Sequence, residues 1–332
     1  MIKRFLLVAC LAGCAGETPD TPPDPGVPPP AAAADQRVLV GEYLLDGDTL
    51  SVLEADGGLR LRDWRGDSVT PFTPGEGEPL VVPAYDADGG VSALQVDGRA
   101  YDRLHLGAED GGTFRITPLR APEELRAEAL AATPPVEEGD FRPSDLVELV
   151  TLDPSIRLDI RYASTNNFMG EVFYSEARAF LQRPAAEALV RANAWLHTQG
   201  YGLLVHDGYR PWYVTKMFWD ATPEPLRIFV ANPANGSRHN RGCAVDLTLY
   251  DLDTGEPIEM TGGYDEMSPR SFPDYPGGTT RQRWHRELLR TAMEAQGFAV
   301  YDAEWWHFDY KDWQRYRIGN QRFEEIAASD GA

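Results

Sequence analysis

The sequence has few cysteines, far fewer basic than acidic residues, and no long apolar run. Its cysteines are Cys10, Cys14 and Cys243. Two of them lie close to the N-terminus, so the folded part holds one thiol and cannot form an internal disulfide. The formal net charge is −21, from 31 Lys and Arg against 52 Asp and Glu. Such a surface repels phosphate backbones, which argues against nucleic acid as a partner.

The most N-terminal apolar run covers residues 5–11 and is too short to span a bilayer as a helix. It follows a basic region with Lys3 and Arg4, which is typical of a signal peptide. Residues 11–14 read Leu-Ala-Gly-Cys and resemble the bacterial lipobox, whose cysteine becomes the lipidated first residue. We therefore predict a lipoprotein signal peptide over 1–14, a lipid anchor at Cys14 and an extracytoplasmic, membrane-anchored protein.

An ordinary signal peptide cut near Ala15 is the alternative. If the source is Gram-negative, alanine rather than aspartate after the lipidated cysteine implies the outer membrane or the periplasmic face.

Two stretches of distinct composition follow the leader. Residues 15–36 contain seven prolines and no apolar periodicity, which predicts an extended tether. Residues 37–119 contain short alternating apolar stretches, separated by pairs such as Asp46-Gly47 and Asp97-Gly98. These pairs supply the positive φ values of tight hairpins. We predict a small all-β domain here, built as an antiparallel meander.

The second half of the chain mixes helical and strand patterns. Residues 120–145 are predicted to form a short helix and a linker, and the mixed pattern begins at about Leu146. Helices and short strands interleave from there, so we assign an α+β fold. The expected elements are helices at 184–199 and 281–296, and strands at 203–205, 244–250 and 298–310.

A metal site is suggested by the placement of two histidines near acidic residues. Asp246 interrupts an otherwise apolar strand, where a buried carboxylate is costly unless it is paired or bound to a metal. A zinc hydrolase needs three nitrogen or oxygen ligands and one open position. His239, Asp246 and His307 could supply them. From the spacing alone, a salt bridge between Asp246 and an arginine is an equally good explanation.

Glu304 lies three residues before His307. On a regular strand these side chains would point to opposite faces, so a bulge or the end of the strand must bring them together. In that arrangement an imidazole would bind the metal, and Glu304 would take a proton from water.

Longer motifs resemble those of the zinc D-Ala-D-Ala peptidases, and most closely the VanX-type D-alanyl-D-alanine dipeptidases. The resemblance is carried by Ser-x-His-x-x-Gly-x-Ala-x-Asp at 237–246 and Glu-x-Trp-His at 304–307. It extends in consistent order over roughly 146–317, through Asp-Ile-Arg-Tyr-Ala at 159–163 and Asp-Gly-Tyr-Arg-Pro at 207–211. It implies a zinc dipeptidase domain over 146–325 with a small antiparallel sheet and flanking helices. It also implies one Zn²⁺ per chain and D-Ala-D-Ala, or a related small D-peptide, as substrate.

The resemblance also implies individual roles. The zinc ligands would be His239, Asp246 and His307, with Glu304 as general base and acid and Arg210 as oxyanion stabiliser. Three residues would surround the ammonium end of the substrate: Tyr162, Ser237 and Asp265. A structural salt bridge is the alternative for Arg210, and turn formation for Asp265.

Two neighbouring residues need separate expectations. His206 departs from the family pattern, and we expect it to face solvent. Cys243 lies among the expected metal ligands, and we expect it to be a small packing residue.

Two other functions fit the same motifs. A peptidoglycan D,D-carboxypeptidase or endopeptidase would act on longer stem peptides and needs an open cleft where a dipeptidase has a closed pocket. A non-catalytic wall-binding lipoprotein would keep the fold without turnover, but the intact Glu304 and intact metal ligands argue against it.

Overall fold

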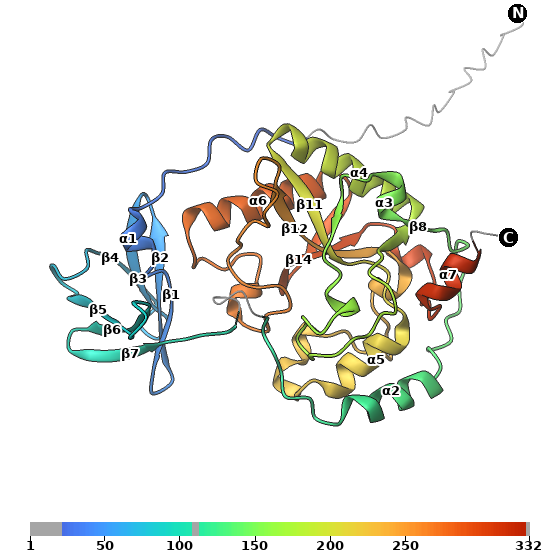
Figure 1. The fold of residues 1–332 in the computed structure, drawn as a ribbon, viewed down its shortest axis with the longest axis horizontal. Helices are drawn as coiled ribbons and strands as arrows, with labels where there is room; N and C mark the ends of the chain where they lie inside the picture. The colour runs from blue at the N-terminus through green and yellow to red at the C-terminus, as the bar shows by residue number, and fades with distance from the viewer. Residues whose placement is uncertain (1–21, 108–112, 330–332) are drawn as a thin grey trace, which may run out of the picture.

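The computed structural model describes residues 22–107 and 113–329, and its chain forms two large sheets, each with its own apolar core (Figure 1). The predicted signal peptide, Cys14 and the first part of the predicted tether lie outside the described residues. Among the helices of the described residues, none combines the length and the apolar character that crossing a bilayer requires.

The N-terminal sheet is antiparallel and has seven strands, in the order β4-β3-β2-β1-β7-β6-β5. Its elements are α1 (Ala34–Arg37), β1 (Gly41–Leu45), β2 (Asp48–Ala55), β3 (Gly58–Asp63), β4 (Ser68–Phe72), β5 (Val81–Tyr85), β6 (Val91–Val96) and β7 (Arg99–Arg103). Asp46, Asp56 and Asp97 have φ values of 52°, 55° and 48°, and a glycine with positive φ follows each. This pairing matches the type I′ turns that join adjacent strands. The predicted meander is therefore present as an open sheet.

The segments on both sides of this sheet pack against the C-terminal part. The indole nitrogen of Trp284 donates a hydrogen bond of 3.2 Å to the carbonyl of Pro25. The predicted tether therefore contacts the folded protein at Pro25, although most of its described residues are exposed. After β7, Phe114 and Ile116 pack on the C-terminal core, and the amide of Ile116 donates to the carbonyl of Phe168 at 3.0 Å. Both residues fall within the predicted β domain at 37–119, but they form no strand.

The C-terminal part is built on a five-stranded sheet in the order β13-β14-β12-β11-β9, in which only the β11–β9 pair is parallel. A two-stranded sheet pairs β10 with β8. The strands are β8 (Leu146–Glu148), β9 (Arg157–Leu158), β10 (Phe180–Gln182), β11 (Tyr201–Asp207), β12 (Ala244–Asp251), β13 (Phe298–Tyr301) and β14 (Glu304–Tyr310). The α-helices are α2 (Pro122–Ala131), α3 (Leu149–Leu152), α4 (Arg183–Thr198), α5 (Trp212–Ala221), α6 (Thr280–Glu294) and α7 (Phe323–Ser329). Mixed helix and sheet confirm the α+β assignment at this level.

The two long helices cover one face of the five-stranded sheet. Helix α4 packs against β11, and α6 packs against β12, β13 and β14 (Figure 1). Along β12, Val245, Leu247 and Leu249 are fully buried in the apolar core. Because side chains alternate along a strand, Asp246 and Thr248 point to the opposite face. That face, away from α4 and α6, carries the polar residues of interest.

The predicted strand at 298–310 is wrong in one respect, because it is a hairpin rather than one strand. The chain turns at Asp302 and Ala303, so that β13 and β14 pair in an antiparallel manner. The turn places Glu304 at the first position of β14, opposite Tyr301, after a register shift in the ladder. The expectation that a bulge or strand end would reorient Glu304 relative to His307 is thereby confirmed.

Buried polar contacts link the N-terminal sheet to the loop between β12 and α6. Glu42 in β1 accepts hydrogen bonds from the hydroxyl of Tyr275 and, at 3.5 Å, from Nη1 of Arg270. Arg270 in turn forms a bidentate pair with Glu266, with distances of 2.7 and 2.6 Å. Trp64 stacks on Tyr275 with ring centroids 6.3 Å apart. The sheet is thus attached to the loop that runs past the candidate site.

Candidate active site and metal centre

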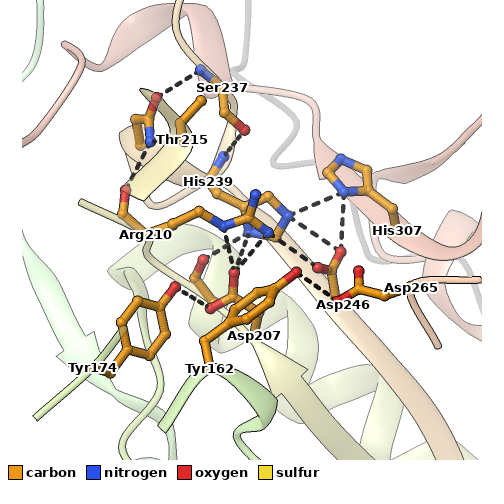
Figure 2. A network of polar contacts seen from close by, with 12 residues as sticks. Tyr162, Tyr174, Asp207, Arg210, Thr215, Ser237, His239, Asp246, Asp265 and His307 are labelled. Carbon is orange, nitrogen blue, oxygen red and sulfur yellow. Dashed lines mark hydrogen bonds and ion pairs between the residues drawn. The ribbon is translucent and has the colours of Figure 1, made fainter. Parts of the chain in front are cut away.

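Three side chains from separate elements converge on the open face of the sheet. His239 lies in a short 3₁₀ helix, while Asp246 and His307 are direct partners on β12 and β14. Nε2 of His239 lies 3.1 Å from Nδ1 of His307, and Oδ1 of Asp246 lies 3.2 and 3.0 Å from these two atoms. Figure 2 shows the three groups pointing toward one another. All three are buried.

The donor set of this cluster fits a tetrahedral metal ion. Bonds of about 2.0–2.2 Å place the ligand atoms of such an ion roughly 3.3–3.6 Å apart. The separations of 3.0–3.2 Å in the cluster are slightly shorter. Burial would raise the pKa of Asp246, but His239 and His307 outweigh it and hold that pKa well below its ordinary value. The carboxylate is therefore ionised, as a metal ligand must be.

Hydrogen bonds on the far side of each imidazole set the ring orientation. Nδ1 of His239 donates to the carbonyl of Gly208 at 2.7 Å, because a carbonyl can only accept. This leaves the lone pair of Nε2 for the cluster. Nε2 of His307 lies 3.0 Å from Oδ1 of Asp309, which leaves its Nδ1 for the cluster.

Glu304 lies beside the cluster rather than within it. Its Oε2 is 3.7 Å from Nδ1 of His307, and its side chain is buried. Burial raises the pKa of Glu304 to about 8, although the nearby His307 acts in the opposite direction. A carboxylate with a raised pKa can take up and release a proton near neutral pH.

Arg210 follows β11 and is buried next to the cluster. Its Nε and Nη2 each lie 2.8 Å from Oδ2 of Asp207, and its Nη2 lies 3.4 Å from Oδ2 of Asp246. The guanidinium also lies over the rings of Tyr162 and Phe218, about 5 Å from each centroid. It is therefore held in one orientation, with Asp207 as its structural partner.

The three predicted substrate-binding residues lie around the same cavity. The hydroxyl of Tyr162 donates to Oδ2 of Asp265 at 2.8 Å. Burial, followed by the charge of Asp246, raises the pKa of Asp265 to about 7. The hydroxyl oxygen of Ser237 accepts a hydrogen bond of 3.2 Å from the amide of His239.

All eight of these predicted residues line one small cavity of about 80 Å³. They are Tyr162, Arg210, Ser237, His239, Asp246, Asp265, Glu304 and His307. Aromatic and aliphatic side chains complete its walls, among them Phe218 and Met267. The ninth predicted site residue, Cys14, lies outside the described residues.

Comparison with known proteins agrees with this geometry. The profile of the M15 peptidase family, described as D-Ala-D-Ala dipeptidase, matches residues 142–329, more than half of the chain. The chain belongs to the M15 peptidase family. A D-alanyl-D-alanine dipeptidase of Escherichia coli is 35% identical over 166 residues, covering 50% of this chain and 84% of the relative. One from Enterococcus faecium is 38% identical over 175 residues, covering 47% and 87%.

The solved structure of the LD-carboxypeptidase LdcB overlaps 58% of this M15 peptidase and 76% of its own chain. Its sequence identity of 18% and TM-score of 0.30 are too low to support further comparison.

Two expectations about neighbouring residues have different outcomes. Cys243 is fully buried in the core, and burial raises the pKa of its thiol to about 12, so it is the expected packing residue. The expectation that His206 faces solvent is wrong, because only 3% of it is exposed. Its ring stacks on Tyr264, with centroids 4.6 Å apart, and its Nδ1 lies 3.3 Å from the carbonyl of Asp159.

Three further residues of the site were given no role in the sequence analysis. Asp207 orients Arg210, Asp309 orients His307, and the hydroxyl of Tyr264 donates to Oδ2 of Asp246 at 3.0 Å. For Asp309 a signal existed, because residues two apart on a strand point to the same face. Tyr264 comes from a loop, where no periodicity gives such a signal.

If the cluster holds zinc, replacing Asp309 by alanine is expected to weaken zinc binding by about 10–100-fold, because His307 loses the partner that sets its ring orientation. The measurement is competition for zinc with a chromogenic chelator. Exposed Asp302 in the nearby turn offers a matched control, and Asp302→Ala should leave zinc affinity unchanged. Equal affinity of the Asp309 variant and the parent protein would contradict the assigned role.

Proposed function

We propose that this M15 peptidase is a zinc-dependent dipeptidase that hydrolyses D-Ala-D-Ala. The main support is the convergence of a three-ligand cluster, a buried carboxylate and a fixed guanidinium on one small cavity. His239, Asp246 and His307 would hold the zinc ion. When bound, zinc would supply Lewis-acid chemistry toward water and the peptide carbonyl.

The residues of the chain supply the remaining steps of hydrolysis. Glu304 takes a proton from the attacking water and later delivers it to the leaving amine, as general base and then acid. Arg210 stabilises the negative charge that develops on the carbonyl oxygen, because its positive group is already fixed by Asp207. Asp265, held by Tyr162, binds the ammonium end of the substrate.

The size of the cavity favours a dipeptide over a longer peptide. Its volume is about 80 Å³, whereas sites for drug-sized ligands occupy roughly 300–1,000 Å³. The Asp265–Tyr162 pair lies in its wall. With the ammonium end of a dipeptide assigned to this pair, a longer peptide would have to continue past it. A carboxylate at that position favours a free ammonium group, which stabilises its charged form, and disfavours a neutral peptide bond.

The decisive assay compares two substrates. Zinc-loaded protein is incubated with D-Ala-D-Ala and, separately, with a stem pentapeptide, and free D-alanine is followed. We expect release from the dipeptide and little from the pentapeptide. Release from the pentapeptide alone would replace the dipeptidase proposal by a carboxypeptidase. Release from neither substrate, with zinc bound, would favour a binding protein.

Replacing Asp265 by asparagine should raise the KM for D-Ala-D-Ala by about 10–100-fold, because an ionic partner of the ammonium group is lost. The kcat should change less, since Asp265 is assigned to bind the ammonium end rather than to hold the metal or move the proton. Steady-state kinetics on D-Ala-D-Ala measures both values. Asp253→Asn, in an exposed turn, is the matched control. A variant that lost kcat at unchanged KM would assign Asp265 to the chemistry instead.

We also propose that the mature protein is a lipoprotein anchored through Cys14 outside the cytoplasm. The support is the lipobox-like sequence at 11–14. Replacing Cys14 by serine should move the protein from the membrane fraction to the soluble fraction. Immunoblots of the separated fractions measure this, with Cys10→Ser as the control. A parent protein that is already in the soluble fraction, with the Cys14 variant unchanged, would favour an ordinary signal peptide.

A further inference from the structure

A second, larger cavity lies between the N-terminal sheet and the C-terminal part. Its volume is about 470 Å³, within the range of roughly 300–1,000 Å³ typical of small-molecule sites. Val40, Gly41, Glu42 and Arg103 line it from the N-terminal sheet and its flanks. The opposite wall comes from β11, β12, β14 and the loop between β12 and α6. The proposed reaction does not use this cavity.

Two buried polar atoms in the wall have unmet hydrogen-bonding capacity. Thr248 and Trp305 line the cavity and are only 5% and 3% exposed. Within the described part of the chain, neither Oγ1 of Thr248 nor Nε1 of Trp305 has a hydrogen-bond partner. Buried polar groups are normally paired, so two unpaired atoms behind one wall favour a ligand there. Each atom exposes less than 1 Å², so a side-chain rotation must turn it toward the ligand. The indole N–H can only donate, so the group that meets it must be an acceptor.

The charges around the cavity favour an anionic acceptor. Arg103, Arg161 and Arg270 line it, together with Glu42 and Glu259. Arg161 is paired with Asp159 and Arg270 with Glu266, so the positive charge available to a ligand is that of Arg103. The Nη1 and Nη2 atoms of Arg103 donate to the main-chain carbonyls of Val38 and Val40, at 2.8 and 2.9 Å. Carbonyl groups do not neutralise the charge of a guanidinium. A carboxylate in the cavity would meet both the positive charge and the indole donor.

This cavity is separate from the candidate active site but shares a wall with it. Tyr264 lines the larger cavity, and its hydroxyl donates to Asp246 on the other side. His206 stacks on the same ring and also lines the larger cavity. None of the eight predicted active-site residues lines this second cavity. Ligands of the two cavities can therefore be distinguished by mutation.

We propose that the cavity between the two sheets is a second binding site, for a small carboxylate-bearing ligand. Thr248 and Trp305 provide its hydrogen bonds, and Arg103 provides its positive charge. Two sources of such a ligand are compatible with the size and chemistry: a free amino acid and a short peptide. The proposal of this second site does not depend on the proposed reaction. Only the choice of binding probes rests on the proposed reaction.

The test is isothermal titration calorimetry on the zinc-loaded full chain. The probes are D-alanine and the first three residues of a peptidoglycan stem peptide, which contain no D-Ala-D-Ala bond to cleave. The same tripeptide with its carboxylates amidated is the chemical control. We expect one of the two carboxylate probes to bind with one site per chain, and the amidated peptide not to bind. The probe that binds identifies the source of the ligand.

Variants in the second cavity and in the active-site cavity show which of the two binds the probe. Thr248→Val keeps the shape but removes the hydroxyl, and it should weaken binding about tenfold. Ile258→Trp fills the cavity and should abolish the heat of binding. Asp265→Asn, in the active site, should leave it unchanged. Because Thr248 has no partner in the described structure, its valine variant should melt at or above the melting temperature of the parent protein without ligand.

Several results would overturn the proposal. One is the absence of binding by both carboxylate probes at millimolar concentration, and another is equal binding of the amidated peptide. Binding that survives Thr248→Val and Ile258→Trp but fails in Asp265→Asn would place the ligand in the active site. None of these results bears on D-Ala-D-Ala hydrolysis, which is measured separately, so the two proposals can fail independently.

Discussion

Replacing Glu304 by alanine is expected to lower kcat for D-Ala-D-Ala by about 10²–10⁴-fold, while the protein keeps its zinc ion. Glu304 lies next to the three-ligand cluster, with its carboxylate 3.7 Å from the ligand atom of His307, but it is not one of the ligands. Its loss therefore removes the group that moves the proton and leaves the metal-binding atoms in place. Zinc content by mass spectrometry and steady-state kinetics on D-Ala-D-Ala measure the two effects.

Two further variants sharpen this test. Glu304→Gln keeps the shape of the side chain but cannot accept the proton, so it should be nearly as inactive as the alanine variant. Exposed Glu259 provides the matched control, and Glu259→Ala should retain full activity. A Glu304→Ala protein with substantial turnover would show that another group is the base. Loss of zinc from that variant would instead make Glu304 part of the metal site.

Replacing His239 by alanine is expected to abolish both zinc binding and activity. The change removes one of three ligand atoms that lie 3.0–3.2 Å from one another, and two remaining ligands do not make a stable zinc site. In the unaltered protein, a chelator should remove activity and added zinc should restore it. The His239 variant should stay inactive at any zinc concentration that the unaltered protein tolerates.

His105 offers the matched control for this experiment, because it is an exposed histidine outside the cluster. His105→Ala should bind zinc and turn over normally. A His239→Ala protein that still bound one zinc ion per chain would move the metal to another set of residues. Resistance of the unaltered protein to chelation, together with full activity in metal-free buffer, would remove zinc from the proposed function.

The sequence predicted which residues come together in the site wherever motifs or the alternation of side chains along a strand identified them. Asp246 interrupts an apolar strand, and the alternation along β12 does place it opposite the fully buried Val245 and Leu247. His239 and His307 were identified by their motifs, and the structure brings both to Asp246. The hairpin turns of the N-terminal sheet were equally predictable from the sequence, because Asp-Gly pairs readily adopt the positive φ values of tight turns.

Other features depend on contacts between distant parts of the chain, so the sequence could not predict them. The turn at Asp302 was missed because the apolar pattern continues on both sides of it. His206 was expected at the surface, but Tyr264, 58 residues later, covers it. The second cavity likewise exists only because β1 and β7 pack near the loop between β12 and α6. No local sequence pattern predicts this packing between distant segments of the chain.

The attachment of Glu42 to Arg270 has a consequence for how this chain can change during evolution. Arg270 is paired with Glu266, next to Asp265, so a residue of the N-terminal sheet helps to hold the loop that carries part of the proposed active site. A substitution at Glu42 would leave the guanidinium of Arg270, whose side chain is only 11% exposed, with one partner fewer. Position 42 should therefore stay acidic among proteins that possess both sheets. In relatives without the N-terminal sheet, the bidentate pair with Glu266 still constrains the position of Arg270.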